Sequence, residues 1–413
     1  MMHMGRWCLV AAVLLLPGRG TAATTLSEAF FQLLDRATVV AEGSIERTDT
    51  FKDGQLVVYR LGVGARLKGE LPAATTIVSA VQELVFSTDR ATLANGMRGI
   101  ALLEPLPTYS SYRNALPEGS YYRFVGERPL LFDPAVADLI RRWVALAALP
   151  QVEQPRARIA LSIDLLPEAT AGDAAAAQLG RSSDLAPLLD EAALTRLTAT
   201  LGNAALPLAR RRAILAALSS RHVTAALPHL RPLEADSSLG PYVRETIASL
   251  GGSVTTEALF RDIERGDPDQ RAAALRALAA RDAERSAEVV ERVGKVATAD
   301  SDERVRLTAI ETLGHCGDAA VPVLGTLLGD PSKRLAHGAS RALVNVHSSA
   351  AVAVLAQQFT SGSNEAQVLA VFALRDINTS EASAALARAK EHASDPRLVR
   401  VIDLATGAGG REH

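Results

Sequence analysis

The sequence predicts a multidomain protein of α and β structure, in which a small N-terminal antiparallel β-barrel or sandwich precedes an α-solenoid of helix pairs. A helical pattern returns about every thirty residues through the C-terminal half. Runs of β-branched and aromatic residues occupy the first part, and strands followed by a run of helices indicate separate domains. The chain divides into a signal peptide, a β-rich domain, a helical junction, the solenoid and a flexible tail, at 1–23, 24–131, 132–204, 205–405 and 406–413.

The N-terminus has the features of a secretory signal peptide. Arg6 precedes an apolar run over residues 8–16, and small residues follow at 21–23. The apolar run is far shorter than the roughly 20 residues of a membrane-spanning helix. We therefore expect cleavage near residue 23 and an exported protein, periplasmic or extracellular, that does not span a membrane.

The next hundred residues predict a short helix and several strands. The helix is expected over 29–36, and the strands are expected at 38–45, 55–61, 75–81, 98–103 and 120–125. Asp53-Gly54 lies between the first two strands, and this dipeptide between strand-like runs is typical of a hairpin. Five short strands in this length favour a small antiparallel barrel or sandwich.

A helical segment joins this domain to the repeats. Asp133-Pro134 is expected to open a helix over 135–149, which Pro150 ends. The residues up to 204 are helical in composition but are interrupted by prolines and glycines. They predict irregular helix pairs that cap the solenoid.

The repeats are recognised by leucines that close each helical copy. These leucines lie at 218, 250, 278, 313, 343 and 374. A unit of this size cannot bury its own apolar stripe, so neighbouring units must stack and expose a long concave face. A small residue at the same place in four copies allows close helix packing; these residues are Ala274, Ala309, Ala339 and Ala370.

Three Asp-Pro dipeptides predict helix starts within the repeats. They are Asp267-Pro268, Asp330-Pro331 and Asp395-Pro396. The carboxylate caps the first free N–H groups, and proline has no N–H to leave unpaired there.

The copies resemble HEAT repeats of the phycobilisome-lyase type. The segment 317–331 is similar to the first helix and following turn of that family, and 305–314 is similar to its second helix. The resemblance covers about residues 205–405 and implies an α-solenoid of HEAT-like helix pairs. Bilin lyases share this repeat type, but an export signal would place this chain away from their pigment-protein substrates.

Composition and motifs argue against several functions. The formal charge of −2, without a long charge run, argues against nucleic acid as a partner. Only Cys316 remains after cleavage of the signal peptide, so an intramolecular disulfide is impossible. His315 and Cys316 alone do not provide the four ligands of a zinc site.

Catalytic motifs are missing from the sequence. It has no Gly-x-Ser-x-Gly elbow, Walker loop, His-Glu-x-x-His or Cys-x-x-Cys. Deoxyhypusine hydroxylase, a HEAT-like enzyme, holds its iron pair on His-Glu dipeptides, and this chain has none. We therefore expect no enzyme activity and no catalytic residue, cofactor or metal site.

An arginine series on the second helices is the first candidate partner surface. Matched positions on stacked helices would make a ladder that meets carboxylates of a partner. The alternative is that these arginines pair with acidic residues of adjoining turns, for which Asp267, Asp302 and Asp330 are well placed. The candidate residues are Arg271, Arg276, Arg306 and Arg341.

A tyrosine-rich stretch is the second candidate. It holds four of the six tyrosines in a chain with 4% aromatic residues. Tyrosine and arginine are enriched at binding hot spots. Alternation along the strand at 120–125 would place either Tyr121 or Tyr122 in the barrel core instead. The candidate residues are Tyr109, Tyr112, Arg113 and Tyr122.

Together these features predict an exported, non-catalytic scaffold or adaptor that binds another protein through the concave solenoid face, the β-domain or both. One alternative is a lyase-like or other enzyme with a site at the junction of the two modules, which clustered titratable residues there would favour. Another is a carbohydrate- or peptide-binding module that uses the tyrosine-rich loop. The partner's identity and the oligomeric state do not follow from the sequence.

Overall fold

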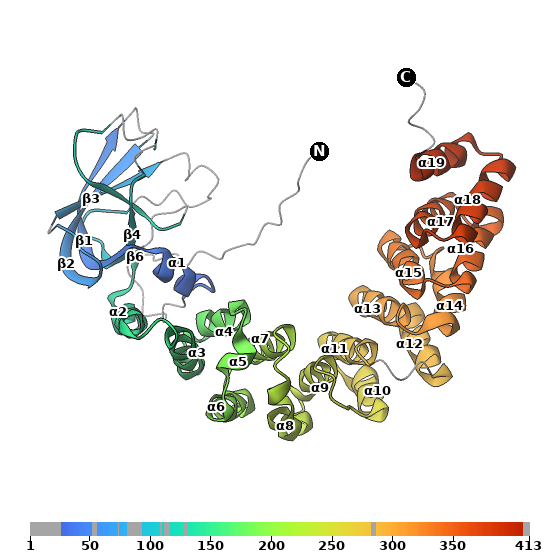
Figure 1. Ribbon diagram of the computed structural model, residues 1–413, viewed down its shortest axis with the longest axis horizontal. Helices are drawn as coiled ribbons and strands as arrows, with labels where there is room; N and C mark the ends of the chain where they lie inside the picture. The colour runs from blue at the N-terminus through green and yellow to red at the C-terminus, as the bar shows by residue number, and fades with distance from the viewer. Residues whose placement is uncertain are drawn as a thin grey trace. The chain divides into compact units, whose positions relative to one another are not determined.

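The protein consists of two compact units, residues 1–221 and 222–413 (Figure 1). The computed structural model describes residues 26–51, 56–72, 74–80, 93–107, 110, 116–126, 131–281 and 286–407. The proposed signal peptide and the last six residues lie outside this part of the chain. The division between residues 221 and 222 leaves α7 (Leu208–Ser220) in the first unit, where it packs on α4 (Gly172–Arg181).

The first unit begins with α1 (Phe30–Arg36) and a small barrel. The strands in its described residues are β1 (Val39–Phe51), β2 (Leu56–Lys68), β3 (Ala74–Ala80), β4 (Arg98–Pro105), β5 (Tyr121–Phe124) and β6 (Leu131–Phe132). They follow the order β1-β2-β3-β5-β4-β6, and an additional β1–β4 pairing closes the sheet. This connectivity makes a five-stranded Greek-key barrel of the OB-fold kind, with β6 added beside β4.

One strand pair of the barrel is parallel, whereas an antiparallel barrel was expected. β3 and β5 are parallel, with Thr76 opposite Tyr121, whereas β5 is antiparallel to β4. The chain passes through β4 on its way from β3 to β5, so β5 returns beside β3 in the same direction. The expected hairpin is confirmed by antiparallel pairing of Phe51 with Leu56, while residues 52–55 between them lie outside the described part.

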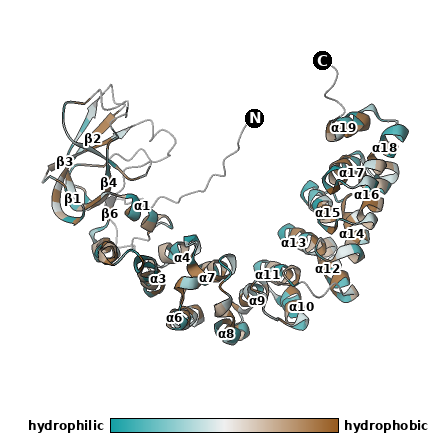
Figure 2. Ribbon diagram, in the orientation of Figure 1, coloured by the Kyte–Doolittle hydropathy of each residue, from teal (hydrophilic) through white to brown (hydrophobic). Residues whose placement is uncertain are grey.

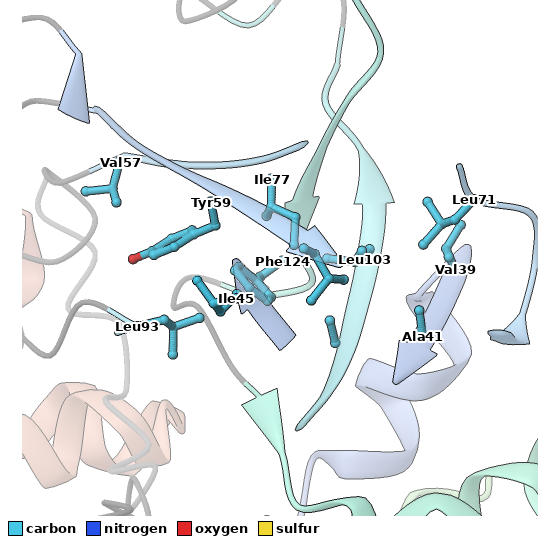
Figure 3. Packing of buried hydrophobic residues seen from close by; sticks show 12 residues of the cluster. Val39, Ala41, Ile45, Val57, Tyr59, Leu71, Ile77, Leu93, Leu103 and Phe124 are labelled. Atoms are coloured by element: carbon cyan, nitrogen blue, oxygen red, sulfur yellow. The ribbon is translucent and has the colours of Figure 1, made fainter. Parts of the chain in front are cut away.

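Alternation along the strands separates two apolar clusters. The interior cluster includes Ile45, Tyr59 and Phe124, which face one another in Figure 3, and the rings of Tyr59 and Phe124 lie 6.1 Å apart. A second cluster covers the opposite face of β2 and β3, where Leu56 and Val58 pack with Leu106 and with residues at and just before the start of β5. The outer face of this sheet pair is therefore covered by the chain itself.

Helices complete the first unit. After a 3-10 turn (Pro134–Val136) that Asp133 caps, they are α2 (Ala137–Ala145), α3 (Gln154–Leu165), α4, α5 (Leu185–Leu188), α6 (Glu191–Gly202) and α7. The expected helix over 135–149 is present as this turn, α2 and a further 3-10 turn, Leu146–Ala148.

The second unit is a stack of helix pairs. The first helices of the pairs are α8 (Leu227–Leu230), α10 (Thr256–Arg265), α12 (Ala287–Ala299), α14 (Val321–Leu327), α16 (Ser349–Ser361) and α18 (Ser380–His392). The second helices are α9 (Gly240–Ser249), α11 (Pro268–Ala279), α13 (Glu303–Leu313), α15 (Lys333–Val346), α17 (Asn364–Ile377) and α19 (Pro396–Thr406). Each second helix contacts the next, and in Figure 1 these helices form the inner row of the unit.

Small residues allow the second helices to pack closely. The four repeated alanines at 274, 309, 339 and 370 are completely buried, as expected. At Gly338 a Cβ atom would come within 2.6 Å of Leu307 Cδ1, so α13 and α15 approach closely there. Figure 2 shows both hydrophobic and hydrophilic residues on the helices of this unit, as expected for a stack with one solvated side.

The Asp-Pro dipeptides start helices at two of three places. Asp267 caps α11 in a complete capping box with Gln270, and Asp395 caps α19. Asp330 does not cap a helix, because α15 begins at Lys333 after Ser332. Its carboxylate instead accepts a hydrogen bond from the Ser332 N–H at 2.8 Å and pairs with Arg306.

Candidate interaction surface

Three ion pairs join successive repeats of the second unit. Arg244 binds Asp262 through two hydrogen bonds of 2.7 Å, and Arg271 binds Asp300 through bonds of 2.9 and 2.8 Å. Arg306 binds Asp330 at 2.5 Å. In each pair both side chains are at most 22% exposed. We call these three pairs the inter-repeat rungs.

Two of the three rungs arise from the same position near the start of the second helix, and Arg244 lies one position later in α9. Arg271 and Arg306 are each the fourth residue of their helices, and each also donates to a carbonyl at the end of the preceding first helix. Arg271 donates to Gly266 O and Arg306 to Ala297 O, both at 3.1 Å. One guanidinium therefore ties the two helices of a pair together and binds the next pair as well.

The arginine series thus has two roles that the sequence did not separate. Arg271 and Arg306 are structural braces, whereas Arg276 and Arg341 are exposed. Of the acidic partners considered, only Asp330 forms a rung. Asp302, like Asp267, caps a helix.

Arg276 and Arg341 belong to a row of equivalent exposed positions. They are the ninth residues of α11 and α15, and the ninth residue of α13 is Glu311. Arg276 pairs with Glu245 of α9. Burial acts to lower the pKa of Arg276, but its hydrogen bond with Glu245 and the nearby carboxylate charges outweigh this effect and raise it.

The row ends on two exposed apolar side chains. The ninth residues of α17 and α19 are Phe372, which is 39% exposed, and Leu404, which is 75% exposed. The Arg375 guanidinium lies 5.1 Å from the centre of the Phe372 ring. Among the described residues, Val152 is the one other large apolar side chain with comparable exposure. No sequence motif marks this row, because its members share a helix position rather than a residue type.

The tyrosine-rich candidate falls mostly outside the part of the chain that the structure describes. This holds for Tyr109, Tyr112 and Arg113. Tyr122 is half-buried and packs against the interior cluster of the barrel, so it is the core residue of the Tyr121–Tyr122 pair. Tyr121 packs on the outer cluster and donates to Pro117 O at 3.0 Å.

The junction of barrel and helices holds a cluster of charged side chains. Asp35 of α1 accepts hydrogen bonds from Trp143 Nε1 at 2.9 Å and from Arg158 at 3.0 Å. Lys68 of β2 donates to backbone carbonyls of Leu34 and Asp35. Burial lowers the pKa of Lys68, the charge of Asp35 opposes this shift and Arg158 adds to it.

These contacts hold three helices and the barrel together. Each oxygen of the Asp35 carboxylate is used, and the Lys68 ammonium group is turned to backbone carbonyls. The cluster does place titratable groups at the predicted junction. Its charged groups bind one another and the backbone, however, so they connect the helices to the barrel.

No group of three or more His, Cys, Asp and Glu side chains among the described residues is placed to hold a metal ion. No helix in the same part of the chain is both long and apolar enough to cross a membrane.

Comparison with known proteins places the repeats. The family model of HEAT repeats matches residues 290–375. The complex of CpcE and CpcF of phycocyanin lyase from Nostoc sp. PCC7120 is similar over 52% of this chain and 94% of that chain, with 18% identity and a TM-score of 0.32. Human deoxyhypusine hydroxylase in complex with glycerol is similar over 66% of this chain and 98% of that chain, with 17% identity and a TM-score of 0.25. The search of curated proteins found no match. Residues 290–375, from α12 to α17, are therefore HEAT repeats.

Proposed function

We propose that this protein is an exported, non-catalytic scaffold that binds another protein through the second helices of its HEAT repeats. The observation that carries the proposal is the row of exposed ninth positions, which ends on Phe372 and Leu404. HEAT repeats suit this role because a stacked array presents an extended surface. Aromatic residues and arginine are enriched at protein–protein interfaces, which fits Phe372 beside Arg375.

The rungs support the same function. They use arginines whose guanidinium groups are largely buried between repeats, and they fix the spacing of α9, α11 and α13, so that the Arg276 and Glu311 part of the exposed row lies on braced helices. A surface fixed before binding loses less conformational entropy when a partner docks. The charged cluster around Asp35 supports an architectural role in the first unit rather than the enzymatic alternative.

The scaffold role is tested by placing a photo-crosslinking amino acid, p-benzoylphenylalanine, on second helices and on a first helix of the second unit. Glu311 and Phe372 probe the second helices, and the exposed Ala353 and Gln357 of α16 are matched controls on a first helix. We expect the second-helix positions to form a defined protein adduct at least fivefold more efficiently in cells. Equal labelling from all four positions, or none, would contradict the proposal.

Export is a separate prediction. Deleting residues 1–23 should retain the protein in the cytoplasm. These residues contain the apolar run and the small residues of the expected cleavage site, which together form the proposed export signal. The full-length chain should be recovered outside the cytoplasm with an N-terminus near residue 23. Fractionation and N-terminal sequencing measure both outcomes, and an exported protein that still begins at Met1 would refute cleavage.

A further inference from the structure

The last three second helices present nine equivalent positions on one face. They are the second, fifth and ninth residues of α15, α17 and α19. Eight of the nine are exposed and Val368 is half-buried, whereas the residues that alternate with them are mostly buried. We call this set the C-terminal grid; its members are Arg334, His337, Arg341, Glu365, Val368, Phe372, Arg397, Arg400 and Leu404.

Contacts between the helices show that the grid is continuous. Lys333 of α15 pairs with Glu365 of α17 at 2.8 Å, which places the starts of these two helices side by side. α17 in turn packs against α19. The grid therefore forms one surface across three neighbouring helices.

The grid carries four arginines and one glutamate, so it is positively charged, whereas the formal net charge of the chain is −2. Within the described part of the chain, no carboxylate pairs with the guanidinium groups of its four arginines, at 334, 341, 397 and 400. Of the acidic residues around them, Glu365 pairs with Lys333, Asp376 with Arg375 and Asp403 with Lys390, while Asp395 caps α19 through the Arg397 N–H. Four uncompensated positive charges thus surround an apolar strip.

The apolar strip consists of Val368, Phe372 and Leu404. It runs from α17 to α19, and the ring of Phe372 also lies beside the Arg375 guanidinium. An apolar side chain of a partner that covers this strip would remove apolar area from water, and acidic residues next to it in the partner would reach the arginines. A complementary partner would therefore carry apolar and acidic side chains at short, regular intervals.

The interval follows from helix packing. Neighbouring helices in such a stack lie about 8–10 Å apart. Three residues of a polyproline II segment span about 9 Å and bring the side chain back to the same face of the segment. An extended segment in this conformation that crosses the helices would therefore place every third side chain over successive helices.

We propose that the C-terminal grid binds an extended acidic segment of a protein partner, with an apolar residue at every third position. This proposal rests on the scaffold function above and adds the place and the chemistry of the partner. A lipid surface fits the grid less well, because the second helices form the inner row of the unit in Figure 1. Nucleic acid fits less well because Phe372 is the one aromatic residue among the nine grid positions that could stack on a base.

The test measures binding of three labelled peptides to the full chain without residues 1–23. The peptides are five repeats of Glu-Glu-Leu, of Lys-Lys-Leu and of Glu-Glu-Ser, and fluorescence anisotropy gives their affinities. We expect the Glu-Glu-Leu peptide to bind at least tenfold more tightly than either control. Equal binding of the Lys-Lys-Leu peptide, or no binding of the Glu-Glu-Leu peptide, would overturn the proposal.

Charge reversal then locates the site. The variant R341E/R397E/R400E should weaken binding of the Glu-Glu-Leu peptide at least tenfold and keep the helical circular dichroism of the parent. The matched variant R261E/R265E/R388E reverses three exposed arginines of first helices and should bind within twofold of the parent. Equal losses in both variants would assign the effect to net charge and overturn the proposal.

Two further probes address the other classes of ligand. Vesicles of equal phosphatidylserine and phosphatidylcholine, and a 15-nucleotide single-stranded DNA, should not bind in a way that R341E/R397E/R400E abolishes. Such binding would assign the grid to lipid or nucleic acid instead. If the crosslinking scan labels Glu311 but not Phe372, and the Glu-Glu-Leu peptide fails to bind, the scaffold function stands and the grid proposal fails. If no second-helix position labels a protein, both fail.

Discussion

Arg271→Ala should lower the free energy of unfolding of the second unit by about 3 kcal/mol, the lower end of the cost of breaking a buried ion pair from one side. The substitution leaves the Asp300 carboxylate, which is 11% exposed, without its bidentate partner. It also removes the donor to Gly266 O. Urea denaturation followed by circular dichroism at 222 nm measures the loss.

Two control variants separate the rung from a general effect of charge. Arg304→Ala breaks an exposed pair with Asp269 and should cost only about 0–1 kcal/mol. The double variant Arg271→Met with Asp300→Leu replaces both charges by apolar groups and should recover most of the lost stability. Equal costs for Arg271→Ala and Arg304→Ala would show that the rung does not brace the stack.

Trp143→Ala should destabilise the first unit by about 3–5 kcal/mol, as for other large-to-small substitutions in a core. Trp143 is 2% exposed, its ring lies 4.1 Å from that of Phe31, and its indole N–H binds Asp35. The substitution opens a cavity between α1 and α2 and removes a donor from a half-buried carboxylate. Thermal unfolding by differential scanning calorimetry measures the change.

The matched control for Trp143 is Val152→Ala. Val152 is 86% exposed, so its truncation should change stability by no more than about 0.5 kcal/mol. Trp143→Phe should fall between the two, since it keeps an aromatic ring against Phe31 but cannot donate to Asp35. A Trp143→Ala protein as stable as the parent would mean that α1 is not anchored through this contact.

The elements of the fold follow closely from local sequence, whereas some of their pairings do not. The strand expected at 98–103 is present as β4, and the leucine period places the second helices correctly, because side-chain periodicity is a local property. The parallel pairing of β3 with β5 depends on how the whole chain closes the barrel. Asp330-Pro331 carries the sequence signal of a helix cap, but the tertiary contact with Arg306 uses the carboxylate instead.

The candidate surface was predicted in part. Arginine at matched repeat positions was evident from the sequence, but the rung partner Asp300 lies two residues before the expected Asp302. Both are turn residues, and only the three-dimensional path of the turn decides which one faces Arg271. The row containing Phe372 and Leu404 consists of the ninth residues of the second helices. It could therefore not be found from the sequence before the first residue of each helix was known.

The rungs also stop partway along the second unit. The fourth residue of α15 is Ala336, and that of α17 is Gln367, which donates only to carbonyls of its own helix pair. In a linear array, stability is a sum of terms between nearest neighbours, so an array with unequal couplings opens first where they are weakest. We therefore expect local unfolding of the second unit to start from α19, so that the grid lies on the part of the array where coupling between repeats is weakest.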